Sequence, residues 1–261
     1  MKILAPSVAG MFYPDDPRVL REMIQKFLGA ADASLPVPKV IIAPHAGFIY
    51  SGATAAAVYA CLTKAKAQIK RVVLLGPAHR YPIQGLAVTD MDGFATPLGE
   101  IAIDKEAIKN ALSLSQVQVI NEAYHGENSL EVQLPFLQEI LGDFKLVPIL
   151  VGDADNTQIV EVLEKLWGGE ETLIVISSDL SHYLDYKSAK NIDAATIEAI
   201  LKLRPQDIAY EQACGRKAIN ALLIVAANKK LKPKLIAACS SGDTAGDKDA
   251  VVGYVGVHFY E

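Results

Sequence analysis

Short runs dominated by Val, Ile and Leu recur along the 261-residue chain. Such runs are typical of strands that are buried on both faces, which is the condition of a parallel sheet. The runs occupy residues 39–43, 72–75, 146–150, 173–176 and 235–238. The pattern therefore predicts five buried strands in one sheet.

Stretches with the helical spacing of apolar residues separate these runs. They occupy residues 54–64, 104–113, 156–167, 193–203 and 215–228. Alternating strands and helices are typical of an α/β fold. We predict a three-layer sandwich with a largely parallel central sheet, formed by residues 1–261 as a single domain, because no linker or repeat interrupts the chain.

Two segments depart from this alternation. Residues 85–103 have little helical spacing and contain Gly93, Pro97 and Gly99, which predicts a β excursion with a hairpin. A helix is indicated over residues 129–141, where a proline at position 135 should start, bend or break it.

Composition narrows the class of protein. Apolar residues make up 51% of the chain and charged residues 21%, which favours a folded core over disorder. The net charge of −5 argues against a nucleic-acid partner. No apolar run approaches the ~20 residues that cross a bilayer, and the N-terminus lacks the hydrophobic stretch of a secretory signal. We expect a cytoplasmic protein with no membrane association, and three widely separated cysteines fit a reducing compartment.

Chemically versatile side chains follow several of the predicted strands. His45, His79 and His182 each lie just past an aliphatic run, and Asp243 follows the run at 235–238. The loops beyond the carboxyl ends of the strands line the binding crevice of an open parallel sheet. We therefore expect these four side chains to converge.

A metal site accounts for this set of residues. Two neutral imidazoles and one carboxylate form the ligand set typical of non-haem Fe(II), and His45, His79 and Asp243 are predicted to supply it. The thiolate of Cys239 in place of the carboxylate would favour softer ions such as Zn(II) or Cu(I). The residues alone leave this choice open.

Other polar residues have both functional and structural interpretations. His182 and His125 are candidates for moving protons, since an imidazole titrates near working pH. Asp179 either caps the next helix or orients a histidine through its ring N–H. His258, inside the apolar C-terminal strand, is expected to be structural.

Three charged residues near these motifs carry less weight. Glu127 and Glu131 lie one helical turn apart on the same face. They could be acids of a site, but a solvated or capping role is the favoured prediction. Arg80 either neutralises an anionic ligand or is solvated. The chain has no Gly-x-Gly-x-x-Gly, P-loop or Gly-x-Ser-x-Gly motif. The sequence therefore favours a metal site over a nucleotide cofactor or α/β-hydrolase chemistry.

Five segments resemble the Memo family. They are PSVAGMFYP at 6–14, PHAGFIYSG at 44–52, LGPAH at 75–79, HGENSLEVQLPF at 125–136 and SSDLSHY at 177–183. The resemblance runs from end to end in order, and it implies a fold like that of class III extradiol dioxygenases.

The resemblance also implies a set of site residues. It places metal ligands at His45 and His79, with His125 and His182 lining the same pocket. The third ligand of animal members is a cysteine near the C-terminus. In this chain the surrounding residues align with Asp243 or Thr244 at that point and place Cys239 a few residues early, so Asp243 remains the predicted ligand.

The leading functional expectation is a metal-dependent oxidoreductase of the dioxygenase type. Fe(II) is the predicted ion, with Zn or Cu as alternatives, and the substrate is an unidentified small molecule. A non-enzymatic module that binds a peptide in the same pocket is the alternative, because animal members are linked to receptor signalling. Metal-assisted hydrolysis is a third hypothesis. The resemblance further implies a radical-SAM partner protein, which accompanies members of this family.

Overall fold

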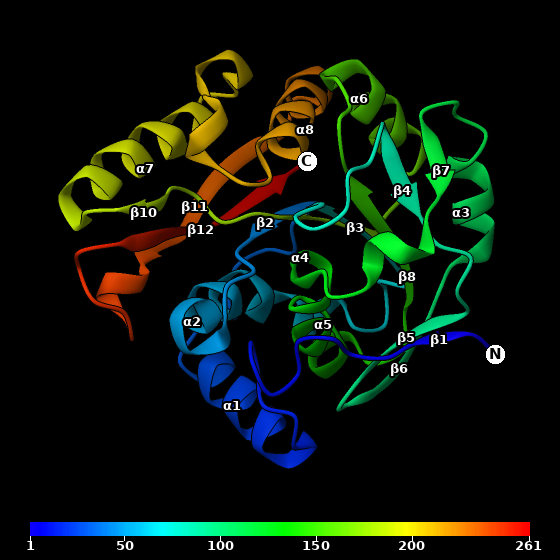
Figure 1. Cartoon of the computed structure of the whole chain (residues 1–261), viewed down its shortest axis with the longest axis horizontal. Helices are drawn as coiled ribbons and strands as arrows, with labels where there is room; N and C mark the ends of the chain where they lie inside the picture. Colours follow the sequence, from blue (N-terminus) through cyan, green and yellow to red (C-terminus); the bar gives the residue numbers. More distant parts are fainter.

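Four parallel strands form the centre of the protein (Figure 1). A computed structural model describes residues 1–261. The strands lie in the order β2 (Val40–Ala43), β9 (Thr172–Ser177), β3 (Arg71–Pro77) and β8 (Lys145–Val151). Nearly all of their residues are buried, as expected for aliphatic strands covered on both faces. The structure confirms the predicted α/β fold with parallel strands at its core.

Antiparallel strands extend this core at both edges. At one edge β12 (Val251–Tyr260) pairs with β2, and β11 (Lys232–Ser240) pairs with β12. The short strand β10 (His182–Leu184) pairs with the beginning of β12. At the other edge β4 (Leu86–Val88) is antiparallel to β8, and β7 (Val117–Val119) is parallel to β4. The large sheet is therefore mixed, with its continuous parallel part in the centre.

The last strand expected to be central, β11, instead lies at an edge of the sheet. Within β11 only Ser240 is buried, and Leu235 is 38% exposed. The run at 235–238 is as apolar as a central strand, so hydropathy alone does not separate the two cases. β11 still points in the same direction as β2, because both are antiparallel to β12.

A small second sheet lies near the N-terminus. It contains β1 (Ile3–Leu4), β5 (Gly93–Thr96) and β6 (Gly99–Ala102), and the last two form a hairpin. Gly99 in this hairpin has a φ of +123°, a conformation that residues with side chains rarely adopt. The hairpin confirms the β excursion predicted for residues 85–103.

Helices cover both faces of the large sheet. They are α1 (Pro17–Gly29), α2 (Phe48–Tyr59), α3 (Lys105–Ala111), α4 (Asn128–Glu131), α5 (Leu134–Leu141), α6 (Asn156–Lys165), α7 (Tyr186–Leu201) and α8 (Arg216–Lys229), with short 3₁₀ turns at η1 (Ala60–Ala65), η2 (Asn121–Tyr124), η3 (Pro205–Asp207), η4 (Tyr210–Gln212) and η5 (Ser241–Asp243). α1, α2 and α5 pack together on one face, and α6, α7 and α8 lie on the other (Figure 1). No helix has both the length and the apolar character needed to cross a bilayer.

The proline at position 135 acts as the sequence indicated. It lies in the first turn of α5, and α4 ends shortly before it. A helix tolerates proline in its first turn because the missing N–H has no intrahelical partner there. The predicted helix over residues 129–141 is therefore divided into two.

Candidate metal centre

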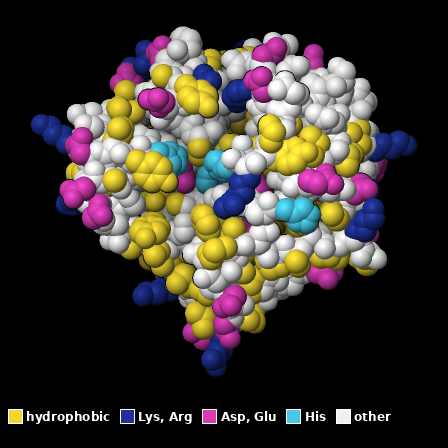
Figure 2. Space-filling view, in the orientation of Figure 1, with side chains coloured by type: hydrophobic (Ala, Val, Ile, Leu, Met, Phe, Trp, Pro, Cys, Tyr) yellow, Lys and Arg dark blue, Asp and Glu magenta, His cyan; other side chains and the backbone are white.

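The carboxyl ends of three parallel strands meet at one place on the surface. His45 follows β2, His79 follows β3 and Asp179 follows β9. The rings of His45 and His79 make an edge contact with centroids 5.3 Å apart. Figure 2 shows histidine side chains beside a hollow near the centre of this face, with an acidic side chain between them. The predicted convergence of His45 and His79 is confirmed, because parallel strands of one sheet end at the same edge.

His45 is buried, and its hydrogen bonds fix the position of its ring proton. Its Nδ1 atom lies 2.9 Å from Oγ of Ser177. That hydroxyl donates its hydrogen to the carbonyl of Ser129 at 2.5 Å and accepts from Nε2 of Gln133 at 2.8 Å. Nδ1 of His45 must therefore be the donor to Ser177, which leaves a lone pair on Nε2.

A buried hydrogen-bond chain behind Ser177 holds this arrangement in place. Tyr59 donates from its hydroxyl to Oε1 of Gln133 at 2.8 Å, and Nε2 of Gln133 also donates to the carbonyl of Pro44 at 2.8 Å. These partners set the orientation of the Gln133 amide. Burial lowers the pKa of His45 to about 3, so its ring is neutral at pH 7. Sequence reasoning misses Gln133 and Ser177, because only the folded chain brings them behind the histidine.

A buried carboxylate holds the second histidine. Glu127 accepts from Nδ1 of His79 at 2.8 Å and from the backbone N–H of His79 at 2.6 Å. It also caps α4 by accepting from the N–H of Ser129, as the sequence predicted. Burial acts to raise the pKa of Glu127, but the hydrogen bonds from His79 and Ser129 outweigh it and lower the pKa. A carboxylate bound to one ring nitrogen directs the other nitrogen toward a metal.

Cys214 supplies a third donor atom beside the two histidines. Its Sγ atom lies 3.3 Å from Nε2 of His45, and one ligand atom from each of His45, His79 and Cys214 lies within 4.8 Å of the others. Burial raises the pKa of the Cys214 thiol to about 12, so it stays protonated unless a cation displaces the proton. Two imidazoles with free Nε2 atoms and a thiol form a donor set that fits a transition-metal ion.

The glycine after Cys214 permits this placement. A Cβ atom at Gly215 would lie 2.6 Å from Cβ of Ser178 and 2.8 Å from the carbonyl of Ser177. A larger residue would push the start of α8 away from the end of β9.

Asp243, the predicted third ligand, belongs to a separate hydrogen-bond network. Its carboxylate accepts from Nζ of Lys190 at 2.7 Å and from the hydroxyl of Tyr186 at 2.5 Å. It also accepts from the backbone N–H of Ser240 at 2.8 Å. Burial opposes a low pKa for Asp243, but the hydrogen bonds from Lys190 and Tyr186 lower it strongly. The structure corrects the predicted position of Asp243. Its carboxylate is bound by Lys190, Tyr186 and Ser240 and does not join His45 and His79.

Strand length explains why Asp243 misses the cluster. Val257 of β12 pairs with both Ile42 of β2 and Leu235 of β11, so these two residues stand level. β2 ends one residue later, whereas β11 continues to Ser240. Each strand residue advances the chain by about 3.3 Å. The longer β11 therefore places Asp243 beyond the level of His45. β11 is also separated from β2 by β12.

The two alternatives to Asp243 also lie outside the cluster. Sγ of Cys239 lies 3.1 Å from Oγ1 of Thr54. The hydroxyl of Thr244 donates to the carbonyl of Ser241 at 3.1 Å. Neither Cys239 nor Thr244 belongs to the group formed by His45, His79 and Cys214.

Asp179 and His182 line the open side of the cluster. They bound a cavity of about 550 Å³ together with His45 and His79. Asp179 is buried and accepts from the backbone N–H of His45 at 2.8 Å, while its other oxygen lies 3.9 Å from Nε2 of that residue. Burial raises the pKa of Asp179 to about 6. Asp179 therefore positions His45 through its backbone. The sequence left two other roles open for Asp179, a helix cap or a contact with a histidine ring N–H, and Asp185 caps α7 instead.

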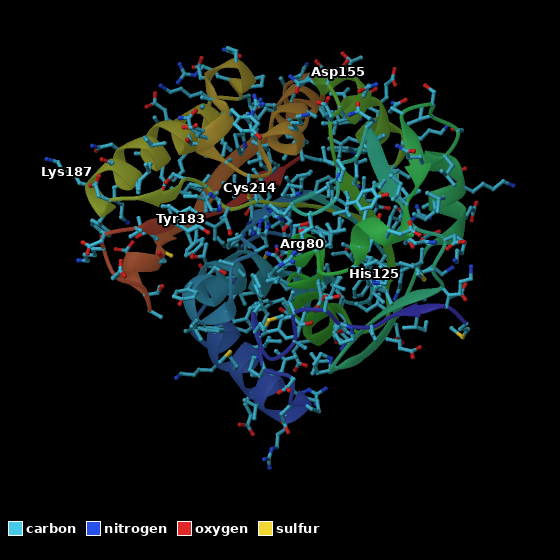
Figure 3. The ribbon with its side chains drawn as sticks, in the orientation of Figure 1. Arg80, His125, Asp155, Tyr183, Lys187 and Cys214 are labelled. Atoms are coloured by element: carbon cyan, nitrogen blue, oxygen red, sulfur yellow. The ribbon has the colours of Figure 1, made fainter.

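His125 lies away from this cavity. It is exposed, and in Figure 3 it lies on the far side of Arg80 from Cys214. It does not line the cavity that His45, His79, Asp179 and His182 bound. The expectation that His125 shares the pocket is wrong. Gly126, with a φ of +75°, turns the chain so that Glu127 points inward instead.

Comparison with known proteins gives a consistent match along the chain. The sequence profile of the family described as "Memo-like protein" matches residues 5–258. A "MEMO1 family protein" of Aquifex aeolicus is 35% identical and covers 99% of this chain and 100% of the relative. A relative of the same description from Archaeoglobus fulgidus is 34% identical and covers 97% of this chain and 98% of its own length. Among solved structures, an uncharacterized protein of Escherichia coli K12 aligns over 98% of both chains with a TM-score of 0.48 and 14% identity.

Proposed function

This chain belongs to the Memo family, and we propose that it is a metal-dependent oxidoreductase whose ion is held by His45, His79 and Cys214. The observation that carries the proposal is the approach of three donor atoms within 4.8 Å of one another. Both imidazoles have Nδ1 occupied by a protein partner, which leaves Nε2 for the ion.

The donor set supports a soft, redox-active ion. The Fe(II) predicted from the sequence depended on a carboxylate as the third ligand. A thiolate in that place favours Cu(I) or Zn(II), and zinc has no redox chemistry. We therefore propose copper, which when bound would supply electron transfer to a ligand in the adjoining cavity.

The protein groups around the cluster would bind and orient a small molecule. The cavity of about 550 Å³ has the size of a small-molecule site, and Tyr50 and Tyr254 contribute aromatic surface to it. The His182 imidazole lines the same cavity and is the group proposed to hold or release a proton at its ring nitrogen. The buried Asp179 carboxyl lines the same cavity.

Metal analysis of pure protein loaded with Cu(I) without oxygen tests the proposal. Wild-type protein should retain about one equivalent of copper, and Cys214→Ser should lose most of it because the thiolate is the strongest soft donor. Cys239→Ser is the matched control, since this thiol contacts Thr54 and not the histidines. Equal copper retention in both variants would rule out the proposed ligand set.

Oxygen consumption with a panel of catechols provides the activity readout. The His182→Asn variant should lower the rate about 10²-fold or more while keeping its copper, because proton transfer would be lost without a change in the ligands. A loaded wild-type protein that consumes no oxygen with any catechol would contradict the oxidoreductase assignment and leave a metal-binding protein.

A further inference from the structure

A second cavity reaches the metal-ligand cluster from another side. It has a volume of about 600 Å³, and its wall includes His79 and Cys214. His45, Asp179 and His182 do not line it, although they line the first cavity. Figure 3 shows Cys214 near the centre of the face that is hollowed in Figure 2. The two cavities therefore meet at His79.

One part of the wall of the second cavity is apolar, and aromatic side chains lie at its mouth. Ile83 and Val151 are buried in its wall beside Pro77. Tyr81 and Tyr210 lie at its edge and are 39% and 78% exposed. Large aromatic side chains that are exposed to solvent to this extent are suited to stacking on a flat ligand.

Arg216 gives this cavity an uncompensated positive charge. The other cation in the wall, Lys217, is paired with Asp153 at 2.8 Å. Arg216 makes no ion pair, and its guanidinium carbon lies 5.4 Å from the ring centroid of Tyr210. An unpaired guanidinium presents a fork of N–H donors that matches the two oxygens of a carboxylate. In a chain with a net charge of −5, this local charge selects for anions.

We propose that the second cavity binds an aromatic carboxylate. Arg216 binds the carboxylate, Tyr210 and Tyr81 contact the ring, and the apolar wall covers its inner edge. The cavity volume is that of a small-molecule site. The proposal rests on the proposed metal centre only for the final contact, in which the inner end of the ligand lies against His79 and Cys214.

Calorimetric titration with benzoate tests the proposal, and metal-free protein is used so that the result does not depend on metal binding. Arg216→Gln should weaken benzoate binding about tenfold or more, the effect of losing a charge-assisted hydrogen-bond pair. Benzyl alcohol, which has the same ring without the charge, should bind more weakly and be insensitive to the substitution. Circular dichroism and the copper content of Arg216→Gln establish that the variant is folded and retains its ligand cluster.

Arg80→Gln is the matched control, because Arg80 is exposed near the cluster but lines neither cavity. It should leave benzoate binding unchanged. Equal weakening in both arginine variants, an unchanged affinity in Arg216→Gln, or a wild-type protein that does not bind benzoate would each overturn the proposal. Loss of copper binding in wild-type protein with benzoate binding intact would instead refute the metal centre alone.

Discussion

Two buried histidines at different places in the same sheet show what separates a structural imidazole from a candidate ligand. In β12, Nε2 of His258 donates to the carbonyl of Val58 at 2.8 Å, and Nδ1 accepts from the hydroxyl of Tyr260 at 2.8 Å. After β2, His45 is equally buried, but its Nε2 atom faces the Sγ atom of Cys214. Burial alone therefore does not mark a site. The distinguishing feature is a ring nitrogen left for another donor or an ion.

The same contrast separates the carboxylates of the two regions. Asp243, at the end of β11, neutralises Lys190 on the surface and closes η5. Glu127, behind the cluster, accepts hydrogen bonds from the backbone N–H and the ring of His79. One carboxylate stabilises an edge of the fold, and the other sets the direction of a ligand atom. Substitutions in the two regions should therefore change different properties.

A large difference between the two carboxylates is expected for Glu127→Gln. The amide keeps the shape of the side chain but removes the charge that holds the His79 ring, so copper affinity should fall about 10–100-fold in a competition titration with a chromophoric chelator. Glu131→Gln is the matched control, because this carboxylate is also buried but accepts from the N–H of Val8 and the hydroxyl of Tyr13. Its effect should appear in the free energy of unfolding and not in copper affinity. Equal losses of copper affinity in Glu127→Gln and Glu131→Gln would contradict a specific role of Glu127 in holding the metal ligand.

His45 and His258 should contribute similarly to the pH dependence of stability, although only His45 should contribute to copper binding. Burial lowers the pKa of His45 to about 3 and that of His258 to about 4, from an ordinary value of 6.5. Between these values and pH 6.5 the unfolded chain binds protons that the folded chain does not, so the free energy of unfolding falls as the pH is lowered. Each residue contributes a slope of up to about 1.4 kcal/mol per pH unit.

Urea unfolding of metal-free protein from pH 7 to pH 4.5 measures these slopes. His45→Asn and His258→Asn should each flatten the dependence relative to wild type, whereas only His45→Asn should abolish copper binding. A wild-type slope in either variant would show that the substituted imidazole is protonated in the folded protein. Copper loss in His258→Asn would show that burial, and not the free nitrogen, decides ligand function.

The smallest effect is expected for Asp243→Asn. The side chains of Asp243 and Lys190 are 27% and 41% exposed, and such partly exposed ion pairs contribute about 0–1 kcal/mol. The thermal midpoint should fall only slightly and copper binding should stay unchanged. Loss of copper would make the end of β11 part of the centre and restore the ligand predicted from the sequence.

Sequence patterns were informative where local features determine the structure. The aliphatic runs located the four central strands, and the strand ends located His45, His79 and His182. These predictions hold because burial on both faces leaves few residue types for a central strand, and because parallel strands deliver their loops to one edge.

The remaining site residues depend on pairing that the sequence does not display. Cys214 reaches the histidines through the packing of α8 against the end of β9, while the length and register of β11 remove Asp243 from them. Gln133 and Glu127 have no local pattern that distinguishes them from solvated polar residues. Long-range register and tight backbone contacts therefore determine which of several candidate side chains complete the cluster.

The three donors come from segments that are far apart along the chain. His45 follows β2, His79 follows β3 and Cys214 precedes α8, so no short peptide contains more than one of them. An ion that needs all three binds the native state and not the unfolded chain, so occupancy adds to conformational stability by mass action, about 2.7 kcal/mol at a free concentration of 100 Kd. The thermal midpoint of unfolding therefore reports metal loading, and comparing it across metal ions identifies the preferred ion before any substrate is known.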